Sequence, residues 1–143
     1  MNRAPLPKPI LLVEDNPMDK DLTLHAFARH RLIHPVQVAR DGEEALAWLP
    51  RWEAGEPLPM VVLLDLKLPR VDGLEVLRQF RANPLARRVP VVVLSSSAQD
   101  ADIQAAYRLG ANSYLVKAVD YDKFIEVAGH IVRYWCELNR LPV

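Results

Sequence analysis

Polar side chains follow directly after four short apolar runs of this sequence. Glu14 and Asp15 follow the run PILLV, Asp65 follows MVVLL, Ser95 follows PVVVL, and Lys117 follows SYLV. Carboxylates bind hard divalent cations, and carboxylate, hydroxyl and ammonium groups together can bind and transfer a phosphoryl group. These residues are therefore the candidates for chemistry, although they lie far apart along the chain.

The apolar runs have the length and composition of strands that are buried on both faces of a parallel sheet. A weaker run, VQVA at 36–39, alternates apolar and polar residues and is typical of a sheet edge. Asn16, Asp41 and Asp72 before three of the expected helices, and glycine after another, are typical helix boundaries. Helices are predicted from Pro17 to about Arg31, from Asp41 through Leu49, from Asp72 to about Ala82, from the serine run to Gly110, and from Asp120 to about Leu138, with a loop at 50–59.

Five strands that alternate with five helices predict a doubly wound parallel α/β sheet, the flavodoxin-like (βα)5 fold with strand order 2-1-3-4-5. We expect one domain at residues 9–143, without an output domain, after a flexible, proline-rich lead-in at residues 1–8. In a parallel sheet the carboxyl ends of all strands lie at one edge. This fold would therefore bring the polar residues at the strand ends together.

Composition excludes several classes of protein. The 143 residues carry 18 basic and 18 acidic side chains, so no net field favours nucleic acid or an anionic membrane surface. No apolar run approaches the roughly 20 residues of a membrane helix, and the N-terminus lacks the apolar segment of a signal peptide. The single cysteine, Cys136, excludes an internal disulfide. We expect a cytoplasmic protein.

The expected cluster of acids has a direct chemical consequence. Two unpaired carboxylates about 4 Å apart repel each other by roughly 4 kcal/mol at an effective dielectric constant near 20. A site built from oxygen ligands with open positions favours Mg²⁺ or Mn²⁺ over zinc. With the cation bound, Asp65 would be a nucleophile toward phosphorus, while Lys117 and the Ser95 hydroxyl would contact the phosphoryl oxygens.

The segments LLVEDN, LLDLKLPRVDG, VVVLSSS and GANSYLVKA, in this order, resemble the receiver domain of bacterial two-component response regulators. The proline-bearing loop before Met60 and the segment IVRYWCELNRLP are most similar to single-domain regulators that partner phytochrome histidine kinases. The resemblance implies a metal site of Glu14, Asp15, Asp65 and the backbone carbonyl of Lys67, the phosphoacceptor Asp65, the phosphoryl-binding residues Ser95 and Lys117, and a conformational switch of Ser95 and Tyr114.

The resemblance also implies a function. The chain would accept a phosphoryl group from a sensor histidine kinase onto Asp65 with Mg²⁺, rather than act as an enzyme on other substrates. The signal would pass through the face formed by the helix after Ser97, the strand 113–116 and the last helix. Tyr114 has an alternative interpretation, because a tyrosine in a strand also packs well for its own sake.

Two other functions are alternatives to the receiver. A phosphohydrolase of the haloacid dehalogenase type needs a second aspartate two positions after its nucleophile, where this chain has Lys67. A docking module that does not need phosphorylation stays open because Ala118 replaces the proline that usually follows the lysine. Either a strained cis bond precedes Ala118, or the bond is trans and Lys117 is displaced.

The last helix carries two sets of apolar residues. One set forms a core stripe that ends with Trp135 and Leu138. Val127, Tyr134 and Leu141 are spaced seven apart and would lie on a second face. We expect a homodimer through the face formed by the helix after Ser97, the strand 113–116 and this last helix, and the alternative is that these residues pack back on their own domain.

Overall fold

The computed structural model describes residues 7–142, so residues 1–6 of the expected lead-in and Val143 lie outside the described part. The strands are β1 (Ile10–Val13), β2 (Val36–Ala39), β3 (Val61–Leu64), β4 (Val91–Ser95) and β5 (Ser113–Val116). The helices are α1 (Pro17–Arg29), α2 (Gly42–Leu46), α3 (Trp48–Glu53), α4 (Gly73–Ala82), α5 (Asp100–Arg108) and α6 (Tyr121–Ile131), with a 3₁₀ turn η1 (Ala86–Arg88) and a π-helical segment η2 (Val132–Leu138). None of the described helices is both long and apolar enough to span a bilayer.

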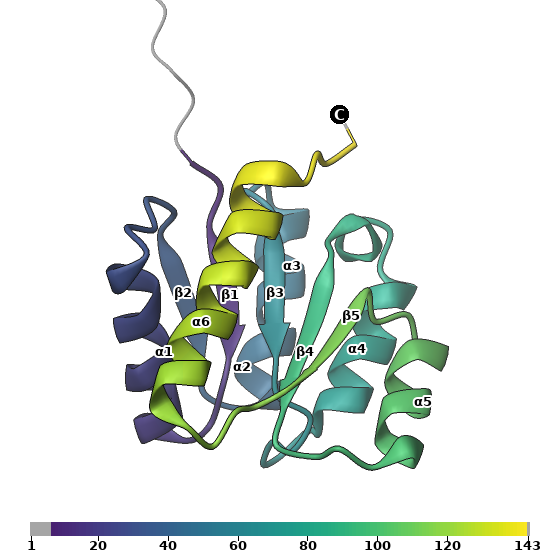
Figure 1. Cartoon of the computed structure of the whole chain (residues 1–143). Helices are drawn as coiled ribbons and strands as arrows, with labels where there is room; N and C mark the ends of the chain where they lie inside the picture. The colour runs from purple at the N-terminus through teal and green to yellow at the C-terminus, as the bar shows by residue number, and fades with distance from the viewer. Residues whose placement is uncertain (1–6, 143) are drawn as a thin grey trace, which may run out of the picture.

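The five strands form one parallel sheet in the order β2-β1-β3-β4-β5 (Figure 1). The flavodoxin-like order predicted from the sequence is therefore confirmed. β1 and β3 are buried along their whole length, whereas β2 and β5 at the two edges are only partly buried. The carboxyl ends of all five strands lie at the lower edge of Figure 1, and the C-terminal segment lies at the upper edge.

Helices cover both faces of the sheet and divide the core into two layers. On one face, Leu11 and Leu64 pack with residues of α2 to α5, among them Phe80. On the other face, Leu12 and Leu63 pack with α1 and α6. Because each inner strand is covered on both faces, its apolar residues need not alternate with polar ones, which explains the continuous apolar runs in the sequence.

The predicted helix starts are confirmed in detail. The Asn16 side chain accepts hydrogen bonds from the backbone N–H of Met18 and Asp19, with Pro17 as the first residue of α1. Asp41 and Asp72 cap α2 and α4 in the same way. These caps satisfy N–H groups that have no partner within the helix, and they fix the start of each helix near the carboxyl edge of the sheet.

The prediction of a loop at 50–59 is partly wrong. The first residues of this segment belong to α3, in which Pro50 occupies the third position. A proline fits there because the first-turn N–H groups have no intrahelical acceptor. Burial of Trp48 and Trp52, which stack on each other, accounts for this extra turn.

The end of the chain also differs from the prediction. From Val132 the helix winds as a π-helix and ends at Leu138, which is exposed rather than part of the core stripe. Leu141 lies beyond the helix, and both Val127 and Leu141 pack against the core layer beside α1 and α6. The shared second face predicted for Val127, Tyr134 and Leu141 is therefore wrong, and only Tyr134 of the three is exposed.

A glycine allows α4 to approach the loop that follows β3. A Cβ atom on Gly73 would lie 2.3 Å from the carbonyl oxygen of Asp65 and 2.6 Å from the Cα atom of Leu66. Both neighbours are backbone atoms and cannot move aside cheaply. Gly73 therefore permits the tight packing that fixes the backbone of Asp65.

Candidate functional site

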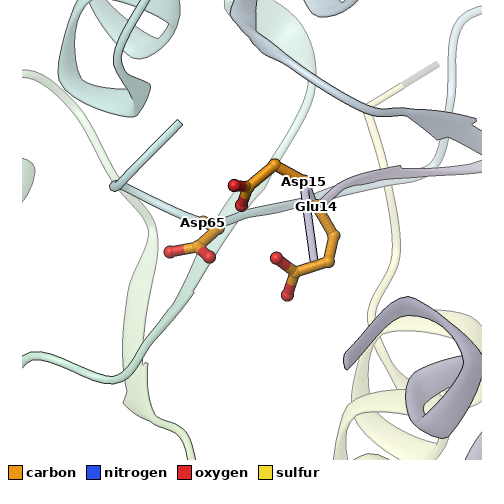
Figure 2. A group of neighbouring side chains, drawn as sticks. All are labelled: Glu14, Asp15 and Asp65. Carbon is orange, nitrogen blue, oxygen red and sulfur yellow. The ribbon is translucent and has the colours of Figure 1, made fainter. Parts of the chain in front are cut away.

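Three carboxylates lie together at the ends of two neighbouring strands (Figure 2). Glu14 and Asp15 follow β1 directly, and Asp65 follows β3. One oxygen from each carboxylate can be chosen so that all three lie within 4.8 Å of one another. The structure thus brings together the acids that the sequence predicted to converge.

Glu14 is the most buried of the three acids, with 4% of its surface exposed. Burial raises its pKa from 4.5 to about 7, although the hydrogen bond and the charge of Lys117 oppose the shift. Asp65 contributes to the increase through charge repulsion. When no cation is bound, the Glu14 carboxyl therefore titrates near neutral pH, whereas an ordinary glutamate is fully ionised there.

The ammonium group of Lys117 reaches into this cluster from the end of β5. Its Nζ atom lies 2.6 Å from Glu14 Oε1, 3.2 Å from Asp65 Oδ2 and 3.1 Å from Asp19 Oδ2. Burial alone would lower the pKa of Lys117, but the hydrogen bond to Glu14 and the charges of Asp65 and Glu14 outweigh it and raise that pKa. Lys117 is therefore a fixed positive charge in the site.

The peptide bond between Lys117 and Ala118 is trans. The sequence left two possibilities, a strained cis bond or a displaced lysine. Neither describes the structure, because a trans bond is combined with direct contact between Lys117 and Asp65. Replacing proline by alanine at this position therefore leaves the lysine within reach of the acids.

The other predicted residues surround this centre. Ser95 is fully buried at the end of β4, and its hydroxyl accepts a hydrogen bond from the Ser97 N–H. The Tyr114 hydroxyl donates to the Ser97 carbonyl oxygen at 2.8 Å. Lys67 has an exposed side chain, and its backbone N–H donates to Asp65 Oδ1 at 3.3 Å. The loop after β4 is thus connected to both Ser95 and Tyr114.

Sequence reasoning missed two residues of the site. Asp19, in the first turn of α1, supplies the third carboxylate contact to Lys117. The sequence contains a signal for Asp19, because the helix start Asn16–Pro17 places this first turn directly after the acid pair. Ser97, in the loop after β4, is the acceptor for Tyr114.

The donor set fits a hard divalent cation. The acid cluster offers only oxygen atoms, and its carboxylates repel one another unless a cation lies between them. Among residues 7–142, this is the one group of histidine, cysteine, aspartate or glutamate side chains arranged to hold a metal. Mg²⁺ or Mn²⁺ suits such a site, since both prefer oxygen ligands and retain bound water.

Comparison with known proteins agrees with this geometry. The family model of the response regulator receiver domain matches residues 10–128. The chain belongs to this family. Its members take part in two-component signalling, and the receiver fold accounts for the strand order described above.

Three relatives of the receiver are especially similar over nearly its whole length. It is 42% identical over 134 residues to the probable methanogenesis regulatory protein FilR2 of Methanothrix harundinacea, covering 93% of the chain and 86% of the relative. It is 38% identical over 138 residues to response regulator Rcp1 of Synechocystis, covering 95% and 94%. The Mn²⁺-bound structure of Rcp1 superposes with a TM-score of 0.87, at 37% identity, and covers 96% of the chain and 100% of Rcp1.

The third relative is the phosphorylated cyanobacterial phytochrome response regulator RcpA. Its structure superposes with a TM-score of 0.88 at 38% identity, and the match covers 96% of this chain and 99% of RcpA. The chain is thus a receiver domain related to phytochrome response regulators.

The raised pKa of Glu14 predicts that cation binding depends on pH. Below pH 7 Glu14 is mostly protonated, so an entering cation must displace a proton. We expect Mn²⁺ affinity, measured by electron paramagnetic resonance, to fall as the pH is lowered from about 8, approaching tenfold per unit below pH 7. Glu14→Gln should bind more weakly at pH 8 and vary little between about pH 6 and 8, since the titrating group is gone. A wild-type affinity that is constant over this range would contradict the assignment.

Proposed function

We propose that this receiver accepts a phosphoryl group on Asp65 from a phosphohistidine of a sensor histidine kinase, with Mg²⁺ held by Glu14, Asp15, Asp65 and the backbone carbonyl of Lys67. The observation that carries the proposal is the contact of Lys117 with both Asp65 and Glu14, because it places a fixed cation beside a carboxylate nucleophile. Family membership supports the same assignment.

The chemistry is a phosphoryl transfer in which positioning matters more than proton transfer. An Asp65 carboxylate oxygen forms a bond to phosphorus, the bond from phosphorus to the histidine nitrogen breaks, and that nitrogen keeps the electron pair. Mg²⁺, when bound, neutralises charge on the transferring oxygens. Lys117 contacts one of these oxygens, and the Ser95 hydroxyl, which accepts a hydrogen bond from the Ser97 N–H, donates to another.

The phosphoryl group would change the conformation of the loop after β4. If the Ser95 hydroxyl turns toward the phosphoryl group, it gives up its present contact with the Ser97 N–H. The Tyr114 hydroxyl is bonded to the carbonyl of the same Ser97, so this tyrosine would follow the loop. The change would reach the face formed by α5, β5 and α6, and these differential contacts would shift the population between two states.

The kinase must approach Asp65 from the carboxyl edge of the sheet. Two apolar side chains border the site there and are almost completely exposed: Met18 in the first turn of α1 and Val119, two residues after Lys117. Exposed apolar side chains next to a reactive group are suited to contact with a protein partner. We assign Met18 and Val119 to the kinase-docking surface.

The class of kinase and the oligomeric state complete the proposal. RcpA is described as a phytochrome response regulator, and its similarity supports a phytochrome histidine kinase as the partner. Homodimerisation is assigned to the α5, β5 and α6 face, now through exposed Tyr107 and Val116 instead of Val127 and Leu141. β5 is an edge strand, so its outer side has backbone groups available for pairing.

Intact-mass measurement after incubation with acetyl phosphate tests the phosphoacceptor. We expect one phosphoryl addition that requires Mg²⁺ and is lost in Asp65→Asn, because an amide is a poor nucleophile. Asp72→Asn is the matched control: asparagine can cap α4 as aspartate does, so this variant should be modified like wild type. Modification of Asp65→Asn would contradict the assignment of the phosphoacceptor. If wild type is not modified and also does not bind beryllium fluoride, the phosphorylation-independent docking module is favoured.

Val119→Glu tests the docking surface. We expect phosphotransfer from a phosphorylated phytochrome histidine kinase to slow by about tenfold or more, because a charge would replace an apolar contact. Modification by acetyl phosphate should stay within about twofold of wild type, since this donor needs no docking. Ile33→Glu is the control, because Ile33 is similarly exposed but lies between α1 and β2 at the other edge of the sheet. Equal effects of the two substitutions would refute the assigned surface.

Sedimentation velocity at micromolar concentration, with and without beryllium fluoride, tests dimerisation. A dimer should appear and should be weakened in Val116→Asp, which would place a charge on the assigned face. Ile33→Glu should sediment like wild type. A monomer under both conditions would overturn the homodimer proposal.

A further inference from the structure

A hollow lined by arginines lies at the end of the sheet opposite to the carboxyl ends of the strands, and so opposite to Asp65. It has a volume of about 490 Å³ and is bordered by η1, the end of α4, the turn before β5 and the end of the chain. Four arginines line it: Arg81, Arg87, Arg88 and Arg140. None of its described lining residues is acidic. In a chain with no net charge, this concentration of positive charge is local and specific.

No carboxylate of the described residues forms an ion pair with these arginines. Among residues 7–142, none of the four has an acidic partner within 4 Å. Arg81 is half-buried, and all its acceptors within the described residues are neutral: the carbonyl oxygens of Gly110, Arg87 and Val89 and the side-chain oxygen of Asn112. A partly buried guanidinium with neutral partners keeps its charge available to an anion.

A second hollow continues the basic surface. It has a volume of about 180 Å³ and shares Arg88, Val89 and Pro90 with the first. Lys8 also lines it, again with no acidic residue among the described lining residues. The two hollows are therefore adjacent and together carry five basic side chains, and we name the pair the arginine hollow.

The shape and the aromatic side chains indicate the class of ligand. Trp135 and Tyr134 line the arginine hollow, with ring centroids 4.9 Å apart and planes nearly perpendicular. Guanidinium groups match phosphate in geometry, aromatic rings stack on a planar base, and the volume falls within the range of small-ligand pockets. We propose that the arginine hollow is a binding site for a nucleoside polyphosphate, separate from the phosphoacceptor site.

Isothermal titration calorimetry with ATP in the presence of EDTA tests the site, because EDTA prevents a metal from bridging ATP to the carboxylates. We expect saturable binding below about 1 mM that weakens with added salt. Arg88→Gln/Arg140→Gln should weaken ATP binding by about tenfold or more. Arg81 is left intact because it donates to four acceptors of the surrounding backbone and side chains and so holds them in place. Arg133→Gln is the matched control, since Arg133 is exposed in the same C-terminal helical segment but lines another hollow.

Two further titrations separate the possible ligands. Tripolyphosphate should bind at least about fivefold more weakly than ATP, and Tyr134→Ser should remove this difference because it removes a stacking surface. Asp65→Asn should bind ATP like wild type, which makes the result independent of the phosphoacceptor. The proposal would be overturned by any of four results. These are absence of saturable ATP binding, equal weakening by Arg133→Gln, equal affinity for tripolyphosphate, and preference for a single-stranded oligonucleotide or a poly-glutamate peptide.

Discussion

The contact between Lys117 and three carboxylates is the interaction on which the site depends. It joins the end of β5 to the end of β1 through Glu14, to the end of β3 through Asp65, and to α1 through Asp19. Without this ammonium, Glu14 would be a buried acid beside other acids, and its ionised form would be strongly disfavoured. The same contact leaves more carboxylates than cations, so the cluster retains the charge that attracts a divalent ion. The site is therefore partly neutralised by Lys117 while still favouring a divalent cation.

Charge is separated between the two edges of the sheet, although the whole chain is neutral. Acids gather at the carboxyl ends of the strands, and arginines gather at the opposite edge around η1 and the end of the chain. Net charge alone therefore gives an incomplete description of what this surface attracts. Anions are repelled near Asp65 unless a cation is bound, whereas the arginine hollow favours them without one.

The fold and the centre of the site could be predicted from the sequence because both follow from local signals. Apolar runs with polar ends indicate buried parallel strands, and the parallel arrangement then brings Glu14, Asp65 and Lys117 to one edge. The exposed Leu138 and the position of Leu141 could not be predicted, because residue spacing assumes a constant helical period and η2 changes it. The arginine hollow was missed for another reason. Its residues come from separate segments, and no motif marks the turns that bring them together.

Communication between the site and the signalling face depends on how the ends of β4 and β5 are joined. The Lys117 N–H donates to the Ser95 carbonyl oxygen at 2.7 Å, and the Tyr114 hydroxyl holds the Ser97 carbonyl oxygen. Two hydrogen bonds therefore connect Tyr114 of β5 and Lys117, which follows β5, to Ser97 and Ser95 at the end of β4. The Ser95 hydroxyl is fully buried, so it cannot turn toward a phosphoryl group without altering the bond to Ser97. Packed groups of this kind exchange between discrete arrangements, which is the condition for a switch with two states.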